Sequence, residues 1–359
     1  MAALKLRDRD AIISPEGLIF RVFGYSHPSD AFICDVEYAP EKIFKSANPK
    51  ALREKGQCRF YKFYEDEGWR FIKNAYPQYM IFHKALGTDV VGVRHKHVAS
   101  IRKPEAALEK ITEKKPKDKL IVALVDVFSL VKAHCSLSSS DFGVFGSLLH
   151  GFYHPNFSDI DLIIYGKDNL AELSEVLRGF YADEHCLLRN EFEDDKAVLR
   201  KNWHFQNYSL KEFLWHQKRK LIYALFKDAK TGRIIKTEFE PVKKWEEIGN
   251  EELFGENVMR KGWTRMVARV VGDGEAPFIP SVYEVEPLEI FEGEASEVSR
   301  IVSYMEEFRL QAFKDEEVYV EGNLEEVETS RGKICQVTLT YCPRYYEQAL
   351  KVIKPRQEP

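Results

Sequence analysis

One short apolar segment with two aspartates limits what this chain can fold into more than any other feature. Residues 158–165 read Ser-Asp-Ile-Asp-Leu-Ile-Ile-Tyr, and such β-branched and aromatic residues are typical of a strand. Side chains two positions apart in a strand point to the same face, so Asp159 and Asp161 are neighbours about 6.6 Å apart along the chain. Ile160, Leu162 and Ile164 face the other way, toward a core.

Two ionised carboxylates on one strand face repel each other, so the pair favours a bound cation. Oxygen ligands of this kind suit Mg²⁺, which keeps several waters and completes its shell with phosphate oxygens. Just upstream, another apolar run ends in Gly146-Ser147. Gly146 permits a close backbone approach, and the Ser147 hydroxyl with the next amides can hold a phosphate. The simpler interpretation is an exposed acidic strand face after an ordinary turn.

At these residues the sequence resembles the DNA-polymerase-β-type nucleotidyltransferase superfamily. The pattern of that superfamily is Gly followed by Gly or Ser, a spacer, and Asp-x-Asp in a hydrophobic strand. Here Gly146-Ser147 and Asp159-Ile160-Asp161 are separated by eleven residues. The whole chain also resembles an archaeal family of predicted nucleotidyltransferases of unassigned substrate, through Glu16-Gly-Leu-Ile-Phe20, Gly24-Tyr-Ser-His-Pro28 and Pro280-Ser-Val-Tyr-Glu-Val285.

The resemblance implies a Mg²⁺-dependent transfer of a nucleoside monophosphate from an NTP to a hydroxyl acceptor. Asp159 and Asp161 would hold two Mg²⁺ ions, and Ser147 with the amides near Gly146 would hold the β and γ phosphates. The basic front half of the chain favours RNA as the acceptor. The alternative is a non-catalytic module of the same fold that binds nucleotide or RNA.

The resemblance also implies a third carboxylate on a strand beside the aspartates. Residues 234–242 read as that strand, with Glu238 and Glu240 on one face. We prefer Glu238 as metal ligand and catalytic group, because Glu240 adjoins Pro241. The proline also indicates an edge strand, on which both glutamates would be merely exposed. Asp183 and Glu184 are weaker candidates. The superfamily usually has Asp here, so a glutamate departs from its pattern.

The length of 359 residues predicts an α+β protein of several domains. Residues 1–105 are an α+β accessory domain, in which the runs 17–24 and 31–38 form a hairpin around a turn. One segment of this domain alternates basic and aromatic residues: Arg59, Tyr61, Lys62 and Tyr64. Such a mixture can bind phosphates and stack on nucleobases. The simpler interpretation is a half-buried sheet with a basic outer face.

Residues 119–250 are the nucleotidyltransferase-like domain, a mixed sheet with helices. Its first helix is predicted from about 119, where apolar residues recur at helical spacing. A second helix, which is rich in basic residues, is predicted from Ser209 to Phe226. It begins with a capping box of Ser209 and Glu212. Lys218 and Arg219 on this helix are candidates to bind nucleotide phosphates. The alternative is a solvated helix face.

Residues 260–345 are predicted to be all-β. Five short strands in this range suggest a small barrel of the OB type, followed by a charged tail from Lys351. Residues 273–328 hold 17 Asp or Glu against 3 Lys or Arg, so phosphates would be repelled here and the rest of the chain is basic. The acidic domain suits docking of a protein partner better than nucleic acid.

Composition excludes several classes of protein. No apolar run reaches the length of a membrane span, and the charged first residues do not suit a signal peptide. Six cysteines occur without a Cys-x-x-Cys pair, so a zinc site is not expected. We therefore expect a cytoplasmic protein that does not bind membranes.

Overall fold

The computed structural model describes residues 4–83, 87–193, 204–249, 257–329, 332–340 and 344–356. The chain divides into two units that are not continuous in sequence. The first unit consists of Met1–His83, Thr88–Asn190 and Leu221–Ile248. The second consists of Lys84–Gly87, Glu191–Lys220 and Gly249–Pro359. Each predicted domain range contains most of one sheet, and the division into three separate domains stays a prediction.

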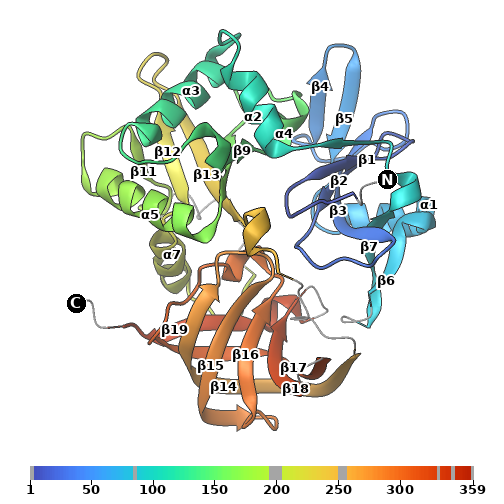
Figure 1. The fold of residues 1–359 in the computed structure, drawn as a ribbon, viewed down its shortest axis with the longest axis vertical. Helices are drawn as coiled ribbons and strands as arrows, with labels where there is room; N and C mark the ends of the chain where they lie inside the picture. Colours follow the sequence, from blue (N-terminus) through green and yellow to red (C-terminus); the bar gives the residue numbers. More distant parts are fainter. Residues whose placement is uncertain are drawn as a thin grey trace. The chain divides into compact units, whose positions relative to one another are not determined.

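An antiparallel sheet occupies the N-terminal part of the first unit (Figure 1). Its main strand order is β4-β5-β3-β2-β1-β8, and β7 joins β3 to β6. The predicted hairpin is confirmed, because β2 pairs antiparallel with β3. The strands are β1 (Ala11–Ile13), β2 (Ile19–Val22), β3 (Ala31–Pro40), β4 (Leu52–Lys55), β5 (Cys58–Lys62), β6 (Met80–His83), β7 (Thr88–Arg94) and β8 (Ser100–Arg102), with helix α1 (Glu67–Ala75) between β5 and β6.

The second sheet of this unit carries the two aspartates. Its order is β11-β12-β13-β10-β9, and only the central pair of β10 and β13 is parallel. The run 234–242 is therefore an interior strand, and the edge strand suggested by Pro241 is wrong. The strands are β9 (Phe142–Val144), β10 (Ile160–Tyr165), β11 (Leu188–Asn190), β12 (Tyr223–Lys227) and β13 (Ile234–Val242).

Helices accompany this second sheet (Figure 1). They are α2 (Pro104–Thr112), α3 (Lys119–Lys132), α4 (Gly146–His150) and α5 (Lys167–Ala182). The prediction of α3 is confirmed: its periodic apolar residues are buried, and the Asp118 carboxylate accepts hydrogen bonds from the Leu120 and Ile121 amides at 3.0 and 3.2 Å. This side chain satisfies two amides that have no partner within the helix.

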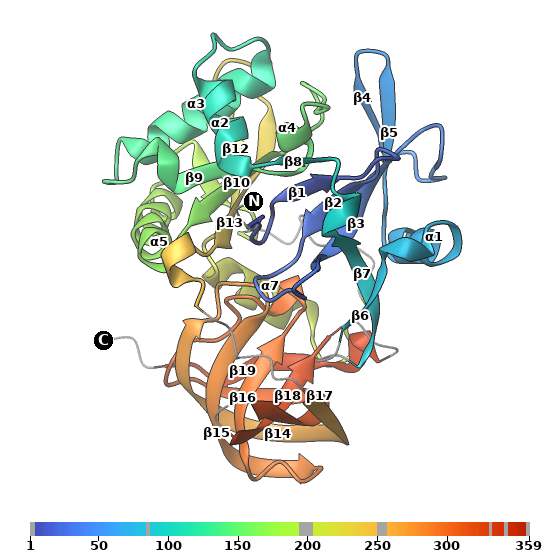
Figure 2. The same ribbon diagram turned by 45° about the vertical axis from the view of Figure 1, so that its right-hand side comes forward.

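A small hydrophobic core joins the N-terminal sheet to α4 and the residues that follow it. Tyr38 of β3 contacts Phe152, which follows α4, with ring centroids 4.7 Å apart. Phe60 of β5 contacts the same ring at 5.3 Å. Ile19 of β2 and Leu149 of α4 belong to the same cluster. The N-terminal sheet is therefore packed directly against the helix that begins with Gly146, as the second view also shows (Figure 2).

The second unit contains helix α7 (Leu210–Arg219). Its capping box is confirmed, because the Ser209 hydroxyl accepts from the Glu212 amide at 3.2 Å and the Glu212 carboxylate accepts from the Ser209 amide at 2.7 Å. The predicted continuation of the helix to Phe226 is wrong. Leu221 has a φ of +60°, which ends the helix, and the apolar run after it is strand β12, paired with β11 and β13.

The remaining strands of the second unit pair into a ring (Figure 1). Their order is β14-β15-β16-β18-β17, and β17 pairs back to β14. The five predicted strands are present, and a sixth strand, β19, overlaps the start of the predicted charged tail. The strands are β14 (Asn257–Glu275), β15 (Ser281–Glu292), β16 (Val298–Ser303), β17 (Glu317–Thr329), β18 (Gly332–Leu339) and β19 (Ala349–Lys354).

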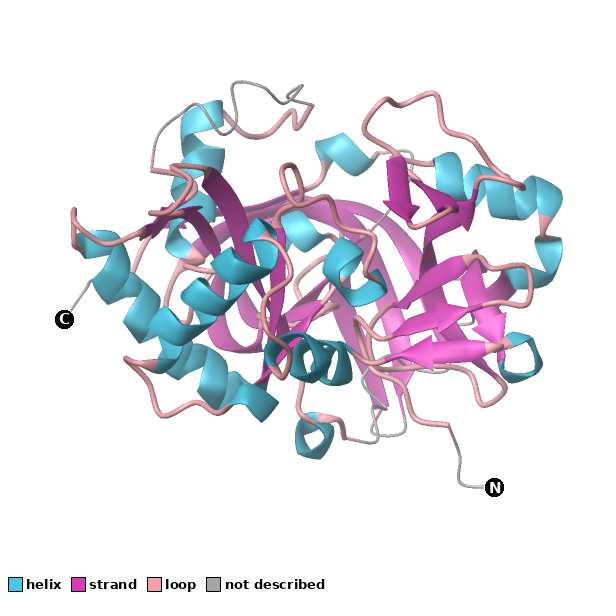
Figure 3. Cartoon of the chain, turned by 90° about the horizontal axis from the view of Figure 1, so that it is seen from above, coloured by secondary structure: helices cyan, strands magenta, loops and turns pink. Residues whose placement is uncertain are grey.

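The described part of the chain is thus a mixed α+β protein with several sheets, as predicted (Figure 3). None of its helices combines the length and apolar character needed to cross a membrane.

Candidate active site

The paired strands β10 and β13 bring three carboxylates together. Asp159 directly precedes β10, and Asp161 lies within it. In the parallel pairing, Asp161 is the partner of Glu238 on β13. Paired residues on adjacent strands share a face and are separated by roughly 5 Å. The structure therefore places the two aspartates and the preferred glutamate on one side of the sheet.

The glycine turn lies directly against this carboxylate group. Gly146 has a φ of +58°, and a Cβ added there would lie 2.6 Å from Asp161 Oδ2. The Phe145 amide donates to the Asp161 carbonyl at 3.1 Å, which fixes the start of α4 beside β10. Ser147 is buried in the first turn of α4. Only a residue without a side chain fits between the turn and the carboxylate, so the two halves of the sequence pattern meet in space.

The site makes ionisation of its aspartates unfavourable. Burial, together with the negative charges of Glu238 and Asp159, raises the pKa of Asp161 to about 8. Burial also raises the pKa of Asp159, with Glu238 adding to the effect, whereas Lys236 and Arg233 oppose it. Unfavourable negative charge concentrated at one place is what a divalent cation would relieve.

A lysine lies beside the third carboxylate of this group. Lys236 lies two residues before Glu238 on β13, and its Nζ is 2.5 Å from Glu238 Oε1. Among the described residues, no group of three or more acidic, histidine or cysteine side chains is placed so that it could hold a metal ion. The Glu238 side chain is 19% exposed, so a ligand can reach it. Metal coordination by Glu238 would require Lys236 to move away from that oxygen.

Glu240 has a different environment from Glu238. Its Oε2 accepts from Arg9 Nη2 at 2.8 Å, and both side chains are buried, with 6% and 2% of their surface exposed. This ion pair links β13 to the segment before β1. Because a buried arginine already neutralises Glu240, the geometry favours Glu238 over Glu240 as the third carboxylate.

An arginine fixes the loop that leads into Asp159. Arg233, just before β13, donates from Nη1 to the Pro155 carbonyl at 3.0 Å and from Nη2 to the Ser158 carbonyl at 2.7 Å. The Ser158 hydroxyl in turn accepts from the His154 amide at 2.8 Å. These bonds hold the backbone immediately before the first aspartate.

Lys218 and Arg219 lie on α7, in the second unit, whereas the carboxylates belong to the first. Lys218 Nζ is 3.6 Å from Glu193 Oε1. Arg219 forms an ion pair with the buried Glu316 and lies over the Trp215 ring at 4.2 Å. Arg219 thus has a structural role within its own unit, and nucleotide binding by these residues stays a prediction.

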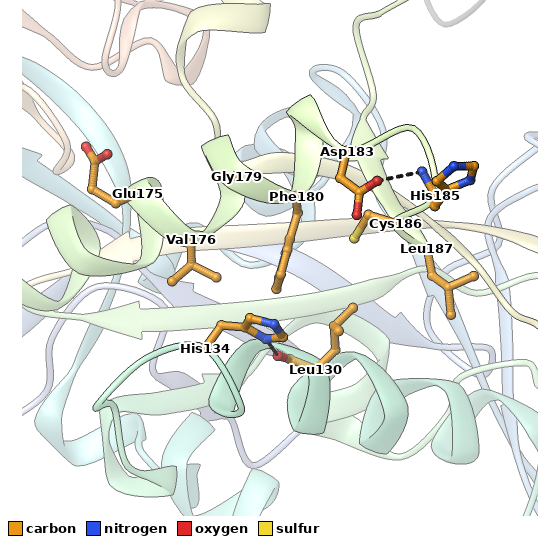
Figure 4. A pocket seen from close by; sticks show the side chains of 10 residues that line it. All are labelled: Leu130, His134, Glu175, Val176, Gly179, Phe180, Asp183, His185, Cys186 and Leu187. Carbon is orange, nitrogen blue, oxygen red and sulfur yellow. Dashed lines mark hydrogen bonds between the residues drawn. The ribbon is translucent and has the colours of Figure 1, made fainter.

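The weaker candidates Asp183 and Glu184 follow α5. Asp183 lines a hollow between α3 and α5, and its Oδ1 accepts from the His185 amide at 2.9 Å (Figure 4). Phe180 and His134 point toward each other across this hollow, with ring centroids 4.9 Å apart. None of the residues that line it is one of the three clustered carboxylates. Asp183 therefore belongs to a different place on the domain.

Sequence reasoning missed three charged residues of the site. Lys236 shares a face with Glu238, and strand alternation alone could have found it. Arg233 precedes the same strand, but its two backbone acceptors lie 75 and 78 residues away. Arg9 is separated from Glu240 by 231 residues, and no local pattern connects them.

Comparison with known proteins shows which family this site resembles. Residues 129–228 match the family model of the nucleotidyltransferase domain. This part of the chain is therefore similar to a nucleotidyltransferase domain. The match confirms the resemblance to the polymerase-β-type superfamily and includes Gly146, Ser147, Asp159 and Asp161. It ends before β13, so it does not include Glu238.

The chain is also similar over most of its length to an archaeal protein, Uncharacterized protein MJ1086 of Methanocaldococcus jannaschii. The two are 26% identical over 337 residues, which cover 92% of this chain and 94% of the relative. This agrees with the resemblance to an archaeal family of unassigned substrate. No solved structure matches the chain significantly.

Proposed function

We propose that the protein transfers a nucleoside monophosphate from an NTP to a hydroxyl acceptor, with Mg²⁺ bound by Asp159, Asp161 and Glu238. The pairing of Asp161 with Glu238 across β10 and β13 carries the proposal. Three oxygen-donor side chains on one sheet face form a donor set that suits Mg²⁺. The glycine turn lies directly against Asp161, so a phosphate held by the amides that open α4 would be beside the same carboxylate.

In this mechanism the acceptor oxygen bonds to the α-phosphorus, the bond from that phosphorus to the bridging oxygen breaks, and pyrophosphate leaves. Two bound Mg²⁺ ions would neutralise the triphosphate charge and make the acceptor hydroxyl more acidic. Asp159 and Asp161 hold the ions. Glu238 completes their oxygen donors and takes the hydroxyl proton. The Ser147 hydroxyl and the first amides of α4 hold the β and γ phosphates.

The acceptor that we favour is RNA, because the chain outside the acidic region is basic overall. We also propose that the five-stranded ring is a small barrel of the OB type, which its closed pairing supports. Its acidic composition argues against nucleic acid and for a protein partner. A nucleotide role for Lys218 and Arg219 belongs to the same proposal.

A radiolabel assay tests the transfer. The protein is incubated with each α-labelled NTP, Mg²⁺ and total RNA, and label on RNA is measured. We expect transfer by the wild type and at least a hundredfold loss in Asp159→Asn and Asp161→Asn, as is usual when charge stabilisation of the transition state is removed. Label transfer that survives both substitutions would show that the carboxylates are not catalytic.

One observation favours the alternative of a nucleotide- or RNA-binding module without catalysis. Lys236 already neutralises Glu238 at 2.5 Å, so the third carboxylate is engaged without metal. In that case the wild type would bind NTP, seen as a rise in melting temperature with Mg²⁺ and NTP, and would transfer no label to any acceptor. The same two measurements therefore separate the two functions.

A further inference from the structure

In the hairpin of β4 and β5 in the N-terminal sheet, every charged side chain on the face toward the candidate active site is positive. In the pairing of β4 with β5, Arg53 opposes Phe60 and Lys55 opposes Cys58. Opposed residues share a face, and so do residues two apart in one strand. Arg53, Lys55 and Lys62 therefore lie on the same face as Phe60. Leu52, Glu54, Arg59 and Tyr61 lie on the opposite face.

Contacts show that the first of these faces is turned toward α4 and the carboxylates. Phe60 packs on Phe152 at 5.3 Å, and Lys55 Nζ donates to the His150 carbonyl at the end of α4 at 3.0 Å. Lys62 is the strand partner of Tyr38, whose ring contacts Phe152 at 4.7 Å. Both views show the hairpin beside α4 (Figures 1 and 2).

Among the described residues, no ion pair joins the cations of this face to a carboxylate. The Lys62 side chain makes no hydrogen bond there; its ammonium lies 5.8 Å from the Tyr64 ring centroid, and its charge helps to lower the pKa of the buried Glu37. Arg53 donates only to the carbonyls of Lys50 and Leu52. On the opposite face, by contrast, Arg59 pairs with Glu54 at 2.9 Å. Charge is therefore balanced on the outer face and left unbalanced on the inner one.

The hairpin is connected to the carboxylate group through α4. This helix begins at Gly146, which lies against Asp161 Oδ2, and ends at His150, whose carbonyl accepts from Lys55 Nζ. Once cations neutralise Asp159 and Asp161, Lys62 and Arg53 have no ion-pair partner among the described residues, and Glu37 is a carboxylate on which the Lys62 charge still acts. Phosphate oxygens are the substrate groups that can serve as such partners, because charge-assisted bonds from ammonium and guanidinium to phosphate are strong.

We propose that the β4–β5 face bearing Arg53, Lys55 and Lys62 binds a phosphate group of the substrate beside Asp159 and Asp161. The inference rests on the proposed nucleotidyl transfer. It adds a substrate-binding surface from outside the nucleotidyltransferase domain, and we call this β4–β5 face the wall. The phosphate belongs either to the triphosphate of the NTP or to the backbone of a nucleic-acid acceptor. Lys62 is its central contact, and Lys55 also fixes the hairpin to α4.

Binding measurements on the full chain test this without relying on turnover. The first probe is inorganic triphosphate with Mg²⁺, and the second is a short single-stranded RNA that ends in a 3′-deoxynucleotide. We expect Lys62→Gln to weaken binding of at least one probe about tenfold or more, since a bond to a charged group contributes about 1.5–3 kcal/mol. Lys62→Arg should restore most of it.

Arg59→Gln is the matched control, because it removes one positive charge from the same strand on the opposite face. It should leave both affinities within about twofold, as expected for an exposed ion pair. A selective loss for triphosphate assigns the wall to the NTP, and a selective loss for RNA assigns it to the acceptor. Melting curves of each variant verify that the fold is kept.

Equal affinity of Lys62→Gln and wild type for both probes would overturn the inference, and so would equal losses in Arg59→Gln. Failure of the wild type to bind either probe would overturn it as well. The label-transfer assay distinguishes these failures from failure of the proposed function. If Asp161→Asn abolishes transfer while Lys62→Gln binds normally, the enzyme stands and only the wall is wrong.

Discussion

Asp161→Asn should stabilise the metal-free protein at high pH, because the native carboxylate is held where ionisation is unfavourable. Its pKa is about 8 in the folded chain against an ordinary value of 3.8. Between these two values the folded state binds a proton that the unfolded state has released, so stability falls as pH rises. From pH 6 to pH 9, a single group with these values removes about 3 kcal/mol from the free energy of unfolding. Asparagine carries no charge and avoids this loss.

The assay is chemical denaturation in EDTA at pH 6 and pH 9. The difference in unfolding free energy between Asp161→Asn and wild type should grow by about 2–3 kcal/mol over this range, in favour of the variant. Exposed Asp168 supplies the control: Asp168→Asn should show a difference that changes little between the two pH values. Taking the difference between proteins cancels the other groups that titrate.

Addition of Mg²⁺ should then reverse the order at pH 9. Binding to the native state alone raises the stability of the wild type, and the variant lacks one of the charged ligands. The reasoning is refuted if Asp161→Asn is no more stable than wild type at pH 9 in EDTA, or if the difference between the two does not depend on pH.

Three further substitutions separate local geometry from chemistry. Gly146→Ala should cost about 1–2 kcal/mol in backbone strain at positive φ and should displace the Asp161 carboxylate. The melting temperature should therefore drop and label transfer should be lost. Normal activity would contradict the 2.6 Å separation between the added Cβ and Asp161 Oδ2. Glu240→Gln should destabilise the protein, because the buried Arg9 then loses the nearer of two carboxylates and keeps Asp8 at 3.6 Å. Glu238→Gln should change the free energy of unfolding by about 1 kcal/mol or less, since its ion pair is partly exposed, but it should abolish label transfer. Unfolding titrations and the label assay measure the two effects. A large loss of stability with normal transfer would contradict the prediction.

The strands that form the site follow from local sequence, because their patterns are strong. The run from Ile234 to Val242 is a strand over its full predicted length, with alternation that puts Glu238 toward the site. Asp161 also lies where the β-branched run places it. The parallel pairing of these two strands, however, depends on packing of the whole sheet, and no short-range signal gives their register.

Other features depend on partners that are distant in the sequence. The run from Tyr223 to Lys227 fits a helical pattern, but pairing on both sides in the sheet overrides that pattern. Strand β19 was missed because its lysines suggest a solvated tail, whereas its backbone pairs with β17. Lys62 could be recognised as part of a basic and aromatic run. Its position beside the aspartates appears only once the N-terminal sheet packs on α4.

The discontinuous first unit has a consequence for biosynthesis. Strand β10 leaves the ribosome well before its neighbour β13, and the intervening chain passes through the whole of Glu191–Lys220, which belongs to the other unit. The nascent chain must therefore keep an apolar central strand incompletely paired until residue 242 has been made. A truncated product that stops at Asp228 would contain both aspartates and the glycine turn but lack the strand that completes their sheet.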